Sequence, residues 1–210
     1  MLGTPQTPST PKSLSNARLL IIDDSRTFCS LLRSIMRDVG LRDITDIVDP
    51  FLALEFLRTN PVDCITLDYV MPGMDGIRLV RALRADPDSL NRLTPIILIT
   101  GHADMRLIKE AVDTGIDEVL VKPLRPATFI QRLTSTIRKP RDCVATASGY
   151  VGPERRRLRD PDHQGSERRQ REDHALISRE ALFYPPDDGQ PAPAPARTAR
   201  SDDADVFLVE

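Results

Sequence analysis

The sequence contains no tryptophan, and aromatic residues make up only 4% of its 210 residues. It also lacks an apolar run near 18 residues and a secretory apolar segment after the amino terminus, so we expect neither export nor a membrane-spanning helix. Only three cysteines are present, Cys29, Cys64 and Cys143, and they have neither metal-ligand nor redox spacing. We therefore expect reduced thiols and a cytoplasmic location.

An excess of charge of one sign is also missing. Lysine and arginine number 29, aspartate and glutamate number 31, and the formal net charge is -2. A balance this even creates no general field that would attract nucleic acid or a membrane surface. The charge balance therefore argues against both as partners of the chain as a whole.

Both ends of the chain lack the apolar side chains that a core needs. Residues 1–16 and 140–210 are rich in proline and poor in valine, leucine, isoleucine and phenylalanine. Such a composition does not offset the entropy of ordering, so we predict a disordered extension over 1–16 and a largely disordered tail over 140–210. Within the tail, 172–183 is the segment for which we consider a short helix. The ordered domain is then predicted at 17–139, long enough for one full core.

Between these flanks, five apolar segments alternate with five segments of helical periodicity. The predicted strands lie at residues 18–24, 44–49, 62–67, 95–100 and 118–122, and a helix is predicted after each. Ser25 has the chemistry of a helix N-cap, and Gly40 is typical of a helix end. Regular alternation predicts an α/β fold in which a doubly wound, five-stranded parallel sheet is covered by helices on both faces.

Polar side chains stand at the ends of four predicted strands, namely Asp23 and Asp24, Asp68, Thr100 and Lys122. The carboxyl ends of parallel strands lie along one edge, so we expect these side chains to converge on one crevice. Clustered carboxylates repel one another, and all-oxygen ligation by aspartate suits Mg²⁺. A lysine and a hydroxyl beside that cation are what a phosphoryl oxyanion requires. The set predicts a phosphoryl site whose acceptor is an aspartate carboxylate.

These motifs resemble the receiver domain of bacterial two-component response regulators. Asp23-Asp24, the stretch Asp68 to Gly76 (DYVMPGMDG), Thr100-Gly101 and Lys122-Pro123 occur in the family's order and at its spacing over residues 17–139. The resemblance implies the flavodoxin-like (βα)5 fold. It also implies a phosphoacceptor that serves a histidine kinase or histidine phosphotransferase, with at most slow autophosphatase activity and signalling by protein contacts.

The resemblance assigns a metal site and an acceptor. Asp68 would accept the phosphoryl group. Mg²⁺ would be held directly by Asp24, Asp68 and the backbone carbonyl of Val70, and Asp23 would reach it through water. The family also implies that a homodimer of the phosphorylated form should be considered.

The resemblance gives Lys122 and Thr100 roles that change on phosphorylation. Lys122 would pair with the acid at rest and with a phosphoryl oxygen afterwards, while the Thr100 hydroxyl would turn inward to bond another oxygen. The Lys122–Pro123 peptide bond is cis in this family.

Three positions depart from the family pattern or set its chemistry. Family members commonly carry an aromatic switch residue three positions before the lysine, where this chain has the small, stiff Val119. Val70 and His102 stand where side chains control the access of water to the acyl phosphate. Because Val70 offers no polar group, we predict slow unassisted hydrolysis.

Two alternative functions follow from other features. The stretch 149–174 is rich in arginine, which favours a nucleic-acid-binding regulator, but acidic residues are interleaved and leave little net field. Docking to an acidic protein surface, or back onto the receiver, fits that mixture better, and the apolar end Asp205–Glu210 could bind a partner groove. A phosphohydrolase of the haloacid dehalogenase type also uses a strand-end aspartate, but its second aspartate would stand where this chain has Val70.

Overall fold

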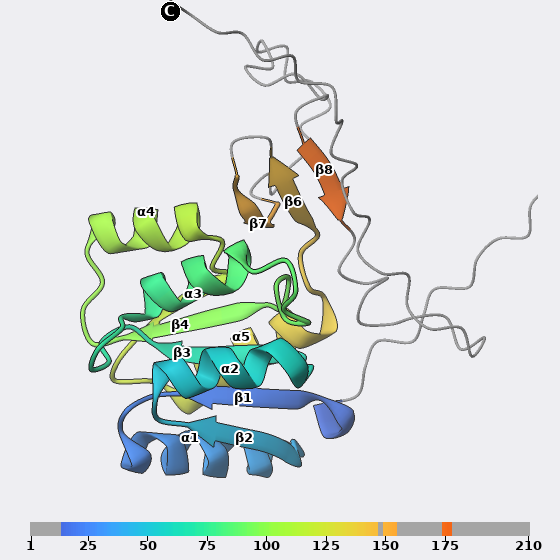
Figure 1. Cartoon of the computed structure of the whole chain (residues 1–210). Coiled ribbons are helices and arrows are strands. Elements are labelled where there is room, and N and C mark those ends of the chain that lie inside the picture. Colours follow the sequence, from blue (N-terminus) through green and yellow to red (C-terminus); the bar gives the residue numbers. More distant parts are fainter. Residues whose placement is uncertain (1–13, 147–148, 155–173, 178–210) are drawn as a thin grey trace, which may run out of the picture.

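The computed structural model of the chain describes residues 14–146, 149–154 and 174–177 (Figure 1). Its main sheet has the order β2-β1-β3-β4-β5, and every neighbouring pair is parallel. The strands are β1 (Arg18–Ile22), β2 (Asp43–Ile47), β3 (Cys64–Asp68), β4 (Ile96–Thr100) and β5 (Glu118–Val121). This order is the flavodoxin-like doubly wound arrangement, so the predicted fold is confirmed.

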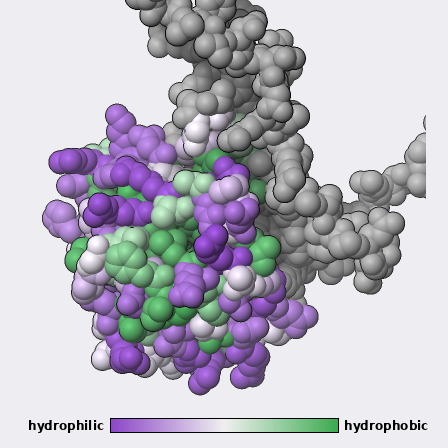
Figure 2. Space-filling view, in the orientation of Figure 1, coloured by the Kyte–Doolittle hydropathy of each residue, from purple (hydrophilic) through white to green (hydrophobic). Residues whose placement is uncertain are grey.

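In the described part of the chain, helices α1 to α5 cover the two faces of this sheet (Figure 1). Helices α1 (Arg26–Asp38) and α5 (Pro126–Arg138) pack on one face, and their apolar side chains form one buried cluster with the strands. Helices α2 (Pro50–Thr59), α3 (Gly76–Ala85) and α4 (Met105–Thr114) pack on the other face around a second cluster. On the side seen in Figure 2, apolar residues gather in the middle and hydrophilic residues surround them.

Four helices begin at a side-chain cap in the loop that follows a strand. The side chains of Ser25, Asp49, Asp75 and Asp104 each accept a backbone N–H from the first turn of α1, α2, α3 and α4. Such caps satisfy donors that the helix itself leaves free. Because each cap follows the carboxyl end of a strand, together they fix the loops along the edge where the functional residues lie.

The chain continues as ordered structure past residue 139, where we predicted a largely disordered tail. Strands β6 (Cys143–Thr146) and β7 (Val151–Pro153) pair antiparallel, and β8 (His174–Ile177) pairs antiparallel with the other edge of β6. The prediction rested on the average composition of the whole tail, which does not reveal a few apolar residues in this segment. Two of them, Cys143 and Val151, are buried against Leu93 and form a small core. We call β6 and β7 with their connection the C-terminal hairpin.

The C-terminal hairpin docks at the amino ends of the parallel strands, opposite the edge that carries the caps. A Cβ placed on Gly115, just before β5, would lie 2.5 Å from the carbonyl oxygen of Val151, so only glycine fits. A Cβ on Gly152 would in turn lie 2.5 Å from Cα of Gly115. The Arg141 guanidinium donates to the carbonyl oxygen of Asp117. The hairpin is therefore in direct contact with the turn that leads into β5.

Two further predictions about the flanks differ from the structure. Residues 174–177 form strand β8, so the short helix considered over 172–183 is wrong for these four residues, which pair with β6. Leu14–Asn16, inside the predicted disordered extension, form a 3-10 turn, and Leu14 packs against the α1/α5 cluster. The apolar end Asp205–Glu210 and most of the arginine-rich stretch lie outside the described residues. None of the helices in the described ranges has the length and apolar composition to cross a membrane.

Candidate functional site

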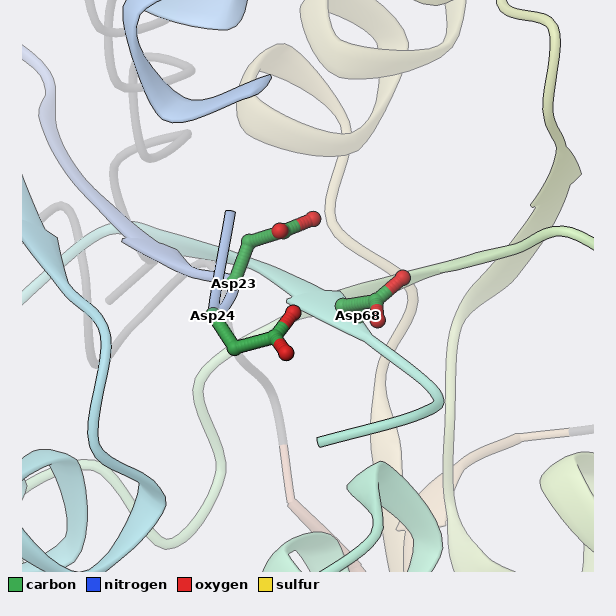
Figure 3. Close-up of side chains that lie close together, drawn as sticks. All are labelled: Asp23, Asp24 and Asp68. Atoms are coloured by element: carbon green, nitrogen blue, oxygen red, sulfur yellow. The ribbon is translucent and has the colours of Figure 1, made fainter. Parts of the chain in front are cut away.

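Three carboxylates meet at the carboxyl ends of β1 and β3, as the sequence predicted (Figure 3). Asp23 and Asp24 follow β1, and Asp68 is the last residue of the neighbouring β3. One oxygen from each lies within 4.8 Å of the others. Asp23 is 2% exposed and Asp68 is 6% exposed, whereas Asp24 faces solvent. The cluster is thus a partly buried acidic pocket with one open side.

Lys122, the residue after β5, brings a positive charge to this pocket. Its Nζ lies 2.8 Å from Oδ1 of Asp68 and 3.1 Å from Oδ2 of Asp23. The ammonium also lies 4.0 Å from the centroid of the Phe28 ring. The Lys122–Pro123 peptide bond is cis, as the family resemblance implies. Lys122 therefore joins the acidic residues of two strands while its side chain remains 28% exposed.

The environment shifts the pKa of two members of the pocket. Burial raises the pKa of Asp23, and the nearby charge of Asp68 adds to this, although the Ser25 N–H and Lys122 act in the other direction. For Lys122, burial alone would lower the pKa, but its hydrogen bonds to Asp68 and Asp23 outweigh burial and raise the pKa. The lysine is therefore held in its charged form by the carboxylates around it.

Both oxygens of the Asp68 carboxylate are engaged in the described structure. Oδ1 faces Lys122, and Oδ2 accepts a hydrogen bond of 3.2 Å from the backbone N–H of Val70. The Val70 side chain itself is 67% exposed. The loop ends at Gly76, whose backbone packs closely against Asp68. A Cβ at this position would lie 2.5 Å from the carbonyl oxygen of Asp68. The loop from Asp68 to Gly76 is thus held against the strand end from which the carboxylate projects.

Thr100 ends β4, the strand beside β3, but its hydroxyl is engaged with the following loop. Oγ1 donates to the carbonyl oxygen of His102 at 2.8 Å and lies 3.2 Å from the backbone N–H of that residue. Thr100 is 1% exposed, so this hydroxyl is shielded from solvent. In this arrangement the hydroxyl bonds the backbone of the β4–α4 loop.

The residues of the pocket fit a magnesium ion. Mg²⁺ is bound by oxygen atoms in an octahedron at about 2.0–2.1 Å, which places neighbouring and opposite ligands about 3–4 Å apart. The three carboxylates supply oxygen atoms within 4.8 Å of one another, and the exposed Asp24 leaves room for water ligands. With Lys122 as the cation that contacts two of the three acids, the pocket retains the excess negative charge that a divalent cation would neutralise.

Comparison with known proteins places this geometry in a family. The profile of the response regulator receiver domain matches residues 19–134, more than half of the chain. The chain belongs to the response regulator receiver family. The chemotaxis protein CheY-3 of Vibrio cholerae is 35% identical over 118 residues, which cover 56% of this chain and 89% of CheY-3. The receiver assignment therefore rests on sequence as well as on the arrangement of the pocket.

A solved receiver shares the fold and carries a metal. The receiver domain of the sensor histidine kinase PA1611 from Pseudomonas aeruginosa, solved with a magnesium ion in its active site cleft, superposes with a TM-score of 0.51 at 25% identity. The superposition covers 58% of this chain and 96% of that domain. A receiver with this architecture thus coordinates magnesium in its cleft.

A third relative is similar beyond the receiver. The cyclic di-GMP phosphodiesterase response regulator RpfG of Xanthomonas campestris is 32% identical over 167 residues, which cover 79% of this chain and 43% of RpfG. A span of 167 residues in a chain of 210 includes the C-terminal hairpin wherever the span begins. Part of the tail that we predicted to be largely disordered is thus included in this similarity.

The structure brings together most of the predicted residues and adds one. Asp23, Asp24, Asp68 and Lys122 share the pocket, whereas the Thr100 hydroxyl bonds the neighbouring loop. Phe28 lies in the helix predicted after the first strand, and no role in the pocket was predicted for it. Its place five residues after Asp23, in the first turn of α1, is the signal that could have located it at the pocket.

Proposed function

We propose that Asp68 accepts a phosphoryl group from a phosphohistidine of a histidine kinase or histidine phosphotransferase, in a reaction that requires Mg²⁺. The observation that carries this proposal is the convergence of Asp23, Asp24, Asp68 and Lys122 at one strand edge of a receiver. A carboxylate oxygen of Asp68 attacks phosphorus and forms the P–O bond of an acyl phosphate. The P–N bond breaks at the same time, and the electron pair leaves with the imidazole of the donor.

Lys122 would contact the negative charge on Asp68 before the transfer and the negative charge on the phosphoryl group after it. Before transfer it contacts Asp68 and Asp23 together. Once Asp68 carries the phosphoryl group, the ammonium keeps its contact with Asp23 and turns its other donor to a phosphoryl oxygen. The lysine therefore stabilises the product without losing both partners.

Asp24 and Asp68, with the backbone carbonyl of Val70 and with Asp23 through water, are the proposed ligands of the magnesium ion. Bound there, the ion would neutralise negative charge on the phosphoryl oxygens. Asp23 also accepts the Ser25 N–H at 2.9 Å, which orients its carboxylate toward Lys122. The Asp24 carboxylate is exposed and stands at the open side of the pocket, where the donor protein would approach.

Signalling would then depend on Thr100 and its loop. We propose that the Thr100 hydroxyl leaves the His102 carbonyl for a phosphoryl oxygen, which releases the loop before α4. Val119, at the position of the usual aromatic switch, is partly buried and packs against the cluster under α2, α3 and α4. The loop, rather than an aromatic rotation, is the element that would report phosphorylation. The hydrocarbon side chain of Val70 supports slow hydrolysis of the acyl phosphate.

The wider role is a phosphoacceptor that signals through protein contacts and has no catalytic activity beyond slow autophosphatase. We place it in the cytoplasm, with a homodimer of the phosphorylated form through the exposed apolar residues Met105 and Val121. RpfG, of which this chain spans 43%, is a phosphodiesterase response regulator, so an attached enzyme is the alternative output in its relatives. A haloacid-dehalogenase-type hydrolase is disfavoured because Val70 cannot act as the second acid.

Labelling tests the proposal directly. We expect radiolabel from acetyl phosphate or a phosphorylated kinase to enter the wild-type chain only with Mg²⁺ and to be lost in Asp68→Asn, because the amide is not a nucleophile for phosphorus. Asp88→Asn, an exposed aspartate beyond α3, is the matched control and should label as the wild type does. Label retained by Asp68→Asn would place the acceptor elsewhere.

A further inference from the structure

One face of the Lys122 ammonium is not occupied by a carboxylate. A lysine ammonium has three N–H donors. Asp68 and Asp23 receive two of them at 2.8 and 3.1 Å, and the Phe28 ring lies 4.0 Å from Nζ to its centroid. A cation at this distance from the face of an aromatic ring is attracted by the ring quadrupole. The ring therefore occupies the side of the ammonium that the two acids leave open.

The turn that carries Phe28 is fixed from several sides. Ser25 accepts the Phe28 N–H at 3.3 Å as the cap of α1, and the Ser25 N–H donates to Oδ1 of Asp23 at 2.9 Å. Cys29, the next residue, donates its thiol to the Asp23 carbonyl at 3.4 Å. One short turn from Asp23 to Cys29 thus presents both a carboxylate and an aromatic ring to the same ammonium. These bonds fix the backbone from which the Phe28 ring projects.

We infer that Phe28 is a positioning residue for Lys122, which confines the ammonium by a cation–π contact so that its N–H groups stay aimed at Asp68 and Asp23. This inference rests on the proposed function, because the benefit of a confined ammonium is a lysine already oriented for the phosphoryl oxygen. Without the ring, the third N–H would turn to water and the ammonium would explore more orientations. Phe28 does not touch the reacting atoms and acts only through Lys122.

The ring makes a measurable contribution in two independent ways. Protons that lie over an aromatic face are shifted upfield in NMR spectra, so the ε-CH₂ protons of Lys122 should be upfield of the other lysines in the wild type. A cation–π contact of a partly exposed pair corresponds to about a two- to fivefold change in a rate or equilibrium. We therefore expect Phe28→Leu to abolish the upfield shift and to slow labelling from acetyl phosphate about two- to fivefold.

Two further variants separate positioning from packing. Phe28→Tyr keeps the ring and should keep both the shift and the rate. Phe56→Leu removes an aromatic ring that is also partly buried, but on α2 and in the other apolar cluster, and should change neither. The inference is overturned if Phe28→Leu labels at the wild-type rate, or if Phe28→Tyr falls as far as Phe28→Leu.

Failure of the proposed function would look different. In that case the wild-type chain would not label at all, or would label at a residue other than Asp68. The upfield shift of Lys122 would still report whether the ring confines the ammonium. Comparison of the urea midpoints of Phe28→Leu and Phe56→Leu identifies any loss of rate that comes from a weakened fold.

Discussion

At the scale of single residues, the buried charges of the pocket lower the stability of the fold. Asp23 is 2% exposed, and it shares Lys122 with Asp68, so one ammonium offsets only part of the charge of two carboxylates. Burial raises the pKa of Asp23, which means that ionisation of this group costs more free energy in the folded state than in the unfolded state. Clustered charges of this kind serve binding rather than stability. A neutral side chain in place of a buried carboxylate is therefore expected to make the fold more stable.

This reasoning predicts a pH-dependent gain from Asp23→Asn. An acid whose pKa is raised in the folded state weakens the fold at pH values above that pKa, and the penalty disappears as the pH falls toward the ordinary value of 3.8. We expect the variant to be more stable than the wild type at neutral pH by about 1 kcal/mol, a typical gain for one stabilising substitution, and the difference to shrink in acid. Urea unfolding at several pH values in metal-free buffer measures it. A constant difference at every pH would contradict this account.

At the scale of elements, the position of Asp68 depends on how α3 begins. The helix starts at Gly76, and the space for a Cβ at that residue is filled by the backbone of Asp68 and the side chains of Leu98 and Leu67. The Gly76 N–H donates to the Tyr69 carbonyl at 2.8 Å. The first turn of α3 is thereby clamped to the end of β3, and the acidic side chain is held at the edge of the sheet.

We therefore expect Gly76→Ala to destabilise the fold by about 1–3 kcal/mol, the usual cost of forcing an extra carbon into a packed region. The phosphoacceptor loop would have to move, so labelling of Asp68 should fall as well. Gly101→Ala is the control, because a Cβ at Gly101 meets nothing within 4 Å and its φ is not positive. Equal urea midpoints for the two variants would show that the loop can move to accommodate the extra carbon without a loss in the free energy of unfolding.

The elements of the receiver and most of its pocket could be predicted from the sequence because they obey local rules. Apolar runs with a carboxylate at the end identified β1 and β3, and the cap at Ser25 marked the start of α1. The sequence could place Phe28 near the pocket, but its contact with the Lys122 ammonium could not be predicted, because that contact depends on the side-chain rotamers of both residues. The state of the Thr100 hydroxyl was equally inaccessible, because it depends on a rotamer and a loop carbonyl.

At the scale of the whole molecule, the ordered unit is larger than the family match. The C-terminal hairpin covers Leu93, buries Cys143 and meets the turn before β5 through Gly152. That turn is already held from inside, because the buried Arg84 donates to the carbonyl oxygens of Thr94 and Gly115 at 2.9 and 3.0 Å. Composition failed here because averaging over a long polar tail hides two short strands. We propose that the folding unit runs from residue 14 to residue 154.

This proposal predicts that a chain ending at residue 139 is less stable than a chain ending at residue 154. The shorter chain loses the burial of Cys143 and Val151 and the bond from Arg141 to Asp117, and we expect a loss of about 2 kcal/mol in the free energy of unfolding. In the full chain, Gly152→Ala should weaken the same contact, since its Cβ meets Gly115. Identical urea midpoints for the two lengths would show that the hairpin contributes nothing to the domain.

The acidic pocket and the C-terminal hairpin lie at opposite edges of the parallel sheet. Strand β5, four residues long, runs between them, from the Gly115 turn to Lys122. A strand of that length spans about 13 Å. Lys122 in the acidic pocket and Gly115, which meets Gly152 of the hairpin, are therefore joined by a single short strand, and a displacement at one end of β5 has only this distance to cross before it meets the other.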